Sequence, residues 1–228
     1  IDVANGYHLW SDAYDREATG IFAIQDEIAA AIADALRVRL AGDDDADAAA
    51  PSTTVVDLEA HDLYLLGLQH WHRRTANDVL RALELFESAA ARDPQYARAH
   101  AGVALAYAVV TNYTRRVPVD DARRLGREAA YRALSLDATL AEAHAALGQI
   151  AQSYDWDLAE SERQNRRALE LNPNFATAHQ WLGETLTALG RWDEAWTALE
   201  TALRLDPLSA LMMNVAGYHQ YLRGDEAE

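Results

Sequence analysis

The sequence predicts an all-α fold made of stacked helix pairs. Two interleaved series of small residues carry this prediction, and the last two intervals in each series are roughly 34 residues long: Ala89, Ala133, Ala168 and Ala202, and Gly67, Ala104, Gly148, Gly183 and Gly217. A fixed period of about 34 residues is typical of repeated helix pairs and not of one globular core. Such stacks usually serve as binding surfaces, so the period also favours a binding function.

Helix-breaking residues supply the third observation. From residue 57 onward the apolar pattern is helical, with breaks near 74–77, 93–95, 112–118, 137–139, 154–156, 172–174, 190–191 and 206–208. Prolines at several breaks lack a backbone donor and disfavour the helical conformation of the preceding residue. Gly190 can adopt the left-handed geometry that ends a helix. We therefore expect four antiparallel pairs followed by one single helix.

The segment 1–56 has a different character. The aromatic-rich segment 6–14 predicts one strand, and the isoleucine spacing in 20–40 predicts a lone amphipathic helix. Residues 41–56 are rich in aspartate and alanine and predict a solvated linker, with an acidic docking tail as the alternative. We expect the natural protein to extend beyond both ends of this sequence.

Composition excludes several functions. The formal net charge is −16 and the pI is about 4.8, which disfavours binding to nucleic acid or to anionic lipid. Cysteine is absent, so disulfides and thiolate metal sites are excluded. No apolar run approaches the ~18 residues that a membrane span needs. We expect a cytoplasmic protein without a cofactor.

Residues 176–209 resemble the tetratricopeptide repeat. Leu182, Gly183, Leu186, Gly190, Trp192, Ala195, Leu199, Ala202 and Pro207 fall at that family's preferred positions. Looser copies cover 60–96, 97–140 and 141–175, and 210–228 matches the first helix of a fifth copy. The 141–175 copy carries one extra residue near 154–157, and Asn165 replaces an expected aromatic residue. The resemblance implies a superhelix of about four and a half helix pairs over 57–228.

The segments 6–16 and 21–28 resemble the end of the TolB amino-terminal-like domain. That domain precedes such repeats in multidomain bacterial regulators, whose output module is a class III adenylate or guanylate cyclase, a winged-helix domain or a kinase. The resemblance implies that residues 1–40 form the end of a small α/β domain, and it implies a bacterial signalling context. It transfers no catalytic residue to this chain.

The residues themselves show no catalytic or metal constellation. The sequence lacks a phosphate loop, a nucleophile elbow and a His-Glu-x-x-His motif. His100, His144 and His179 occupy equivalent places in successive repeats, where side chains point in parallel and do not converge on one ion. We interpret them as packing or capping residues. The arginine doublets, such as Arg73-Arg74, are interpreted as solvated helix ends and as partners of Glu and Asp on their own helices, with recognition of an acidic partner as the alternative.

The first helix of each pair lines the concave face in tetratricopeptide repeats. Mapped onto this chain, that face predicts a partner-binding groove of aromatic, amide and charged residues: His61, Tyr64, Leu68, Trp71, His72, Arg98, Gln149, Gln152, Gln180, Glu184, Asn214, Tyr218 and Tyr221. Such a lining suits an extended peptide or a partner helix. The chain has no lysine, which argues against the basic clamp of co-chaperone repeats.

We therefore predict a non-catalytic scaffold or sensor module that binds a protein or peptide. The alternative is the regulatory tail of a class III cyclase or of a winged-helix transcriptional regulator. A further alternative is homodimerisation through the unpaired helix 208–223, whose apolar face carries Leu211, Val215, Tyr218 and Leu222, or through the N-terminal strand.

Overall fold

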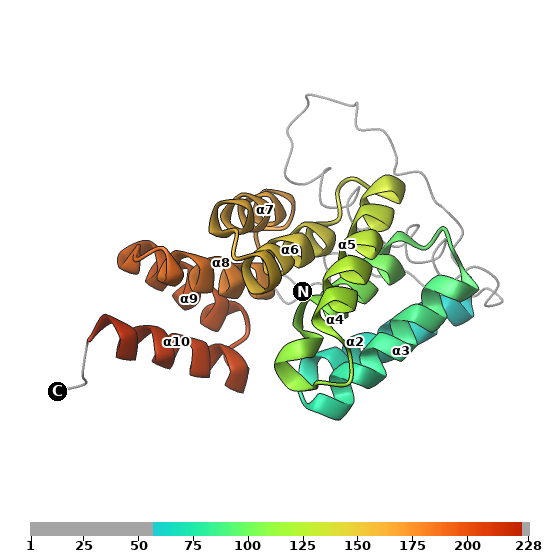
Figure 1. Cartoon of the computed structure of the whole chain (residues 1–228), viewed down its shortest axis with the longest axis horizontal. Coiled ribbons are helices and arrows are strands. Elements are labelled where there is room, and N and C mark those ends of the chain that lie inside the picture. Colours follow the sequence, from blue (N-terminus) through green and yellow to red (C-terminus); the bar gives the residue numbers. More distant parts are fainter. Residues whose placement is uncertain (1–56, 225–228) are drawn as a thin grey trace, which may run out of the picture. The chain divides into compact units, whose positions relative to one another are not determined.

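The computed structural model describes residues 57–224, and this part of the chain contains helices and no strand (Figure 1). The predicted all-helical array is confirmed there. The predicted strand 6–14, the helix 20–40 and the linker 41–56 lie outside the described residues.

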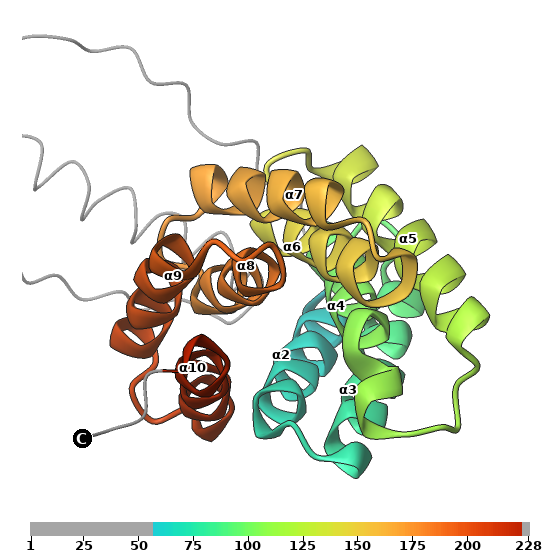
Figure 2. The same ribbon diagram turned by 60° about the vertical axis from the view of Figure 1, so that its left-hand side comes forward.

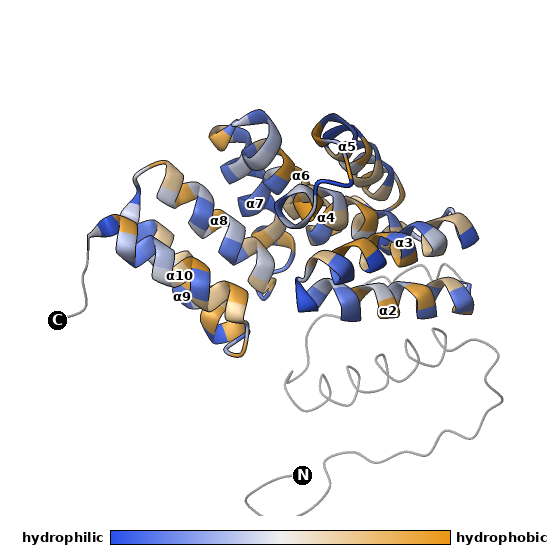
Figure 3. Ribbon diagram, turned by 60° about the horizontal axis from the view of Figure 1, so that its bottom comes forward, coloured by the Kyte–Doolittle hydropathy of each residue, from blue (hydrophilic) through white to orange (hydrophobic). Residues whose placement is uncertain are grey.

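The described helices follow one another in antiparallel pairs, with breaks at the predicted places. In chain order they are α2 (Leu58–Arg73), α3 (Ala76–Arg92), α4 (Ala97–Tyr113), α5 (Val119–Leu136), α6 (Ala141–Ile150), the π-helix η1 (Ala151–Asp155), α7 (Leu158–Leu171), α8 (Ala176–Ala188), α9 (Trp192–Leu205) and α10 (Ala210–Arg223). Apolar and polar residues alternate along them with a helical period (Figure 3). The last helix, α10, packs against α9 and α8.

Local side-chain chemistry fixes several helix ends. Thr75 and Ser209 begin α3 and α10, because their hydroxyl oxygens accept hydrogen bonds from Asp78 N (3.2 Å) and Met212 N (3.3 Å). Asp157 caps α7 in the same way, accepting from Glu160 N at 3.0 Å. Gly190 has φ +72° directly after α8, which confirms the predicted left-handed stop.

Large side chains packed against glycines set the spacing between helices. A Cβ added at Gly67 of α2 would lie 2.5 Å from the ring of Phe86, and one added at Gly102 of α4 would lie 2.6 Å from that same ring. Phe86 is fully buried between the two helices. At Gly183 a Cβ would lie 2.6 Å from Leu199. These close approaches explain the small residues at positions 67 and 183 of the repeat period.

The core is centred on α4, where every residue from Ala101 to Val110 is buried. This helix packs against α3, α5 and α6. Figure 2 shows α4, α6 and α8 on the inner side of the array, with α5, α7 and α9 on the outer side. The first helix of each of these pairs therefore faces inward.

The extra residue near 154–157 is accommodated by η1, which continues α6 as one π-helical turn. A π turn contains one more residue than an α turn, so the insertion does not disturb the next pair. Tyr154 secures the turn, because its hydroxyl donates to the carbonyl oxygen of Tyr107 at 2.6 Å and accepts from Thr111 Oγ1 at 3.1 Å. The turn ends at Trp156, whose φ is +59°.

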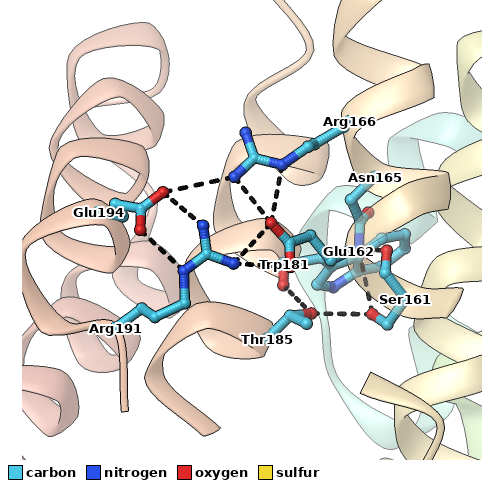
Figure 4. Close-up of polar contacts among 8 residues, drawn as sticks. All are labelled: Ser161, Glu162, Asn165, Arg166, Trp181, Thr185, Arg191 and Glu194. Atoms are coloured by element: carbon cyan, nitrogen blue, oxygen red, sulfur yellow. Dashed lines mark hydrogen bonds and ion pairs between the residues drawn. The ribbon is translucent and has the colours of Figure 1, made fainter. Parts of the chain in front are cut away.

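A network of ion pairs joins α7 to the start of α9 (Figure 4). Arg191 donates to Glu162 of α7 at 2.7 Å and to Glu194 of α9 at 2.6 Å, and Arg166 also pairs with Glu162 at 2.8 Å. Burial opposes ionisation of Glu162, but hydrogen bonds from Arg166 and Arg191 outweigh it and lower the pKa of that carboxyl. The network therefore stabilises the stacking of neighbouring pairs.

Replacing Gly183 with leucine is expected to lower the free energy of unfolding by about 1–3 kcal/mol, because the new side chain overpacks the contact with Leu199. The matched control is Gly217→Leu, since no atom lies within 4 Å of a Cβ built at Gly217. Urea denaturation of both variants measures the difference. Equal stability of the two would contradict the packing described for Gly183.

Glu162→Gln is expected to lower the free energy of unfolding at pH 7 by about 0.5–1 kcal/mol, since Arg191 is partly exposed and screened. The pKa of Glu162 is lower in the folded state than its ordinary value of 4.5. Its contribution is thus complete above pH 4.5 and disappears as the pH falls through the folded-state pKa. Denaturation at pH 7 and pH 3 tests this, with Glu170→Gln in an exposed pair as the control. A pH-independent effect would refute it.

Candidate peptide-binding groove

A groove of about 480 Å³ runs between α8 and α10 on the inner side of the array. It is lined by Gln152, Glu184, Thr187, Ala188, Asn214, Val215, Tyr218, His219 and Leu222. Four of these were predicted from the sequence: Gln152, Glu184, Asn214 and Tyr218. They come from η1, α8 and α10, so three successive repeats contribute to one surface.

Two smaller hollows, of about 190 and 350 Å³, lie where the end of α2 approaches α8 and the start of α10. His72, Arg74, Asp206, Ser209 and Leu211 line both of them, and Gln180 lines the smaller one. Figure 2 shows α2 and α10 facing each other across the inner side of the array. Residues from the first and last described repeats therefore meet at one place.

Arg74 occupies an unusual position between α2 and α3. Its backbone has φ +54°, a conformation that costs a non-glycine residue about 1–2 kcal/mol. Its guanidinium carbon lies 3.5 Å from the ring centroid of Trp71, a cation–π contact with a buried ring. Burial lowers the pKa of Arg74 to about 10, against the opposing influence of Tyr113 and Glu184, so the side chain remains protonated at neutral pH.

Glu184 and Gln180 lie one turn apart on α8. Gln180 Nε2 donates a hydrogen bond of 2.7 Å to Glu184 Oε1. Burial raises the pKa of Glu184, while the bond from Gln180 and the charge of Arg74 act in the opposite direction. The amide oxygen of Gln180 is buried and accepts no hydrogen bond from the described residues. This face of α8 therefore holds a desolvated carboxyl, which lines the groove, and an unsatisfied acceptor on a residue that lines the smaller hollow.

Buried polar side chains behind the groove hold Gln152 in place. Thr185 Oγ1 lies 2.8 Å from Gln152 Oε1 and 2.8 Å from Ser161 Oγ. Asn165, which replaces the expected aromatic residue, donates to the Ser161 carbonyl oxygen at 3.0 Å. Figure 4 shows Thr185, Ser161 and Asn165 in line between α8 and α7. This series of hydrogen bonds thus connects the groove side of the array to its outer helices.

The remaining predicted groove residues lie elsewhere. Tyr64 packs in an aromatic cluster with Phe86 and Tyr96, and His61 Nδ1 lies 2.9 Å from the Tyr96 hydroxyl. Trp71 is buried beneath Arg74, and Gln149 is buried and donates to Ser153 at 3.0 Å. None of the three hollows is lined by these residues or by the rest of the predicted set: Leu68, Arg98 and Tyr221.

The interpretation of Arg73-Arg74 as a solvated helix end holds for one member of the doublet only. Arg73 is exposed and lies 3.6 Å from Asp78, whereas Arg74 is half-buried and lines two hollows. Sequence reasoning also missed Asp206, which lines both smaller hollows. For Arg74, the predicted break at 74–77 was the available signal, because the side chain of a residue at a helix end need not follow the apolar face of that helix. Arg124 and Arg166 do pair with acids on their own helices, as expected.

The three equivalent histidines have packing and capping contacts. Nε2 of His100 lies 3.1 Å from the carbonyl oxygen of Pro94, and Nε2 of His179 lies 2.9 Å from that of Pro173. His144 differs, because its Nδ1 contacts Gln164 Oε1 at 2.7 Å instead. Among the described residues, no group of three potential ligands could hold a metal ion.

Stacked helix pairs with a groove on the inner side define the class of helical repeat scaffolds. Residues 165–197 match the family model of the tetratricopeptide repeat. A crystal structure of a thermophilic tetratricopeptide repeat protein from Thermus thermophilus is similar, with a TM-score of 0.57, 18% identity and coverage of 72% of this chain and 83% of that one. The chain therefore carries a tetratricopeptide repeat, and its described helices have the fold of tetratricopeptide repeat proteins.

Two further similarities were found. PilF of Pseudomonas aeruginosa has a TM-score of 0.51 and 19% identity, covering 73% of this chain and 70% of that one. A putative adenylate cyclase 3 of Rhizobium meliloti (strain 1021) is 37% identical over 106 residues, which is 46% of this chain. The match spans only 18% of that protein. No helix in residues 57–224 has the length and apolar character needed to cross a bilayer.

Arg74→Asn is expected to change the free energy of unfolding by less than about 1 kcal/mol. Asparagine tolerates the positive φ, and the strain that it relieves is similar in size to the cation–π contact that is lost. Trp156→Asn is the control: its φ is also positive and its side chain is 83% exposed, so only strain is relieved and stability should rise. Chemical denaturation measures both. A loss for Arg74→Asn well beyond the worth of one cation–π contact would show that Arg74 is mainly structural.

Proposed function

We propose that this chain is a non-catalytic interaction module that binds a peptide segment of a partner protein in the groove between α8 and α10. The observation that carries the proposal is the groove itself, which combines amides, a carboxyl and aromatic and aliphatic side chains from three repeats. Amide groups can bond a peptide backbone, and Tyr218 and Leu222 offer apolar contact. This combination suits an extended ligand.

The exposure of the lining supports this function. Tyr218 is 59% exposed although it lines the groove, and Leu222 is 43% exposed. Exposed aromatic and aliphatic residues beside polar groups are typical of recognition surfaces. The hydrogen bond from Thr185 fixes the side chain of Gln152 in the absence of a partner, which reduces the conformational entropy lost on binding.

A regulatory role beside a nucleotide cyclase is the second candidate. It is favoured by the 37% identity to the putative adenylate cyclase and by the resemblance of the first segments to bacterial regulators. In this role the array would sense a cytoplasmic partner and transmit its binding to an output domain. A winged-helix regulator would use the array in the same way. Sequencing the gene upstream of Ile1 and assaying cyclic nucleotide formation by the full protein distinguish a cyclase from a winged-helix regulator.

Self-association stays an alternative function for α10. Of the four residues predicted for its apolar face, Val215, Tyr218 and Leu222 line the groove and Leu211 lines the hollows beside it. A dimer through this face would therefore occupy the same surface as a peptide. Light scattering at increasing protein concentration tests it, and a strict monomer would exclude it.

Tyr218→Ala is expected to weaken peptide binding about tenfold or more, since it removes an aromatic anchor from the groove. Tyr131→Ala is a matched control, because Tyr131 is 60% exposed on α5 and lines none of the three hollows. Fluorescence anisotropy with labelled peptides selected from a random display library measures both affinities. Equal affinity of the two variants would exclude this groove as the site.

A further inference from the structure

One acidic and one basic side chain, both partly removed from solvent, line neighbouring parts of the inner surface. Glu184 lines the groove between α8 and α10, and Arg74 lines the two hollows at the end of α2. Each influences the pKa of the other, yet within the described residues they form no ion pair, and neither pairs with another charged side chain. Holding a charge in a partly buried site without a direct partner is costly.

Their immediate contacts position these groups without neutralising them. Arg74 lies on the face of Trp71, and Glu184 accepts a hydrogen bond from the neutral amide of Gln180. The other ionisable groups around Arg74 are Tyr113, Arg73, His72 and Asp206. Arg73 pairs with Asp78, and burial together with the charge of Arg74 lowers the pKa of His72, so its ring is neutral at pH 7. Asp206 is the one acid that lines the hollows with Arg74.

Gln180 connects the two parts and is itself incomplete. It lines the smaller hollow with Arg74, and its Nε2 is bonded to Glu184. Its buried Oε1, on a side chain that is 3% exposed, accepts no hydrogen bond from the described residues. A peptide N–H lying across α8 at this point would satisfy it. The groove and the smaller hollow thus offer places for a cation at Glu184, a backbone donor at Gln180 and an anion at Arg74.

We infer that the groove and the adjoining smaller hollow together select an extended peptide segment carrying a basic side chain, which pairs with Glu184, and an acidic side chain, which pairs with Arg74. Gln180 and Glu184 lie one helical turn apart on α8, so one extended segment can reach both. The motif therefore combines a basic and an acidic residue in one short segment. This inference rests on the proposed peptide-binding function and specifies its ligand.

A display library of short random peptides tests the inference. The wild-type protein should enrich peptides that carry both a basic and an acidic residue. Selection with Arg74→Gln should lose the preference for the acidic residue only, and Glu184→Gln should lose the preference for the basic residue only. Arg204→Gln and Glu200→Gln, both exposed on α9, are charge-matched controls and should select the wild-type motif.

A second measurement uses the wild-type protein alone, so it does not depend on the folding of a variant. In an enriched peptide, lysine→glutamine and glutamate→glutamine replacements should each weaken binding about tenfold or more in fluorescence anisotropy. Enriched peptides without charge preference, or replacements without effect, would overturn the inference and leave peptide binding standing. Enrichment of no peptide above background would overturn the proposed function as well.

Discussion

The whole array depends on one kind of contact, in which a bulky side chain of one helix lies directly against a glycine of its neighbour. Phe86 makes this contact twice, with Gly67 of its own pair and with Gly102 of the next. A methyl group at either glycine would overlap the ring, so the approach of α2, α3 and α4 is set by the absence of two Cβ atoms. The same contact at Gly183 and Leu199 sets α8 against α9. Because each contact fixes only neighbours, the position of the groove follows from repetition of local packing.

The sequence could predict these local features because each has a local chemical cause. Gly190, Pro94 and Pro173 mark helix ends through their own backbone preferences, and the period of the small residues identifies which helices touch. The histidines show the limit of this reasoning. His100 and His179 contact the carbonyl oxygen of a proline six residues earlier, whereas His144 contacts Gln164 on α7. Equivalent positions in the repeat thus have different partners.

Features that depend on distant repeats could not be predicted in this way. The sequence places Arg74 in a doublet at a helix end, a position that is usually solvated. Its burial arises because residues 72–74 approach α8 and the α9–α10 turn, which are far away along the chain. Asn165 is a similar case. The sequence shows that a polar residue replaces an aromatic one at this position. Its hydrogen bond to Ser161, and the further hydrogen bonds through Thr185 to Gln152, depend on how α7 and α8 pack.

The two unpaired charges also connect the net charge of the chain to its choice of ligand. At −16 the chain repels acidic partners at long range, so Arg74 alone would attract an acidic segment poorly. A basic residue in the same segment offsets this repulsion and pairs with Glu184, which brings the acidic residue to Arg74. A direct bond between Arg74 and Glu184 would remove both requirements, whereas the guanidinium of Arg74 lies on the face of Trp71 and the carboxyl of Glu184 accepts a hydrogen bond from Gln180.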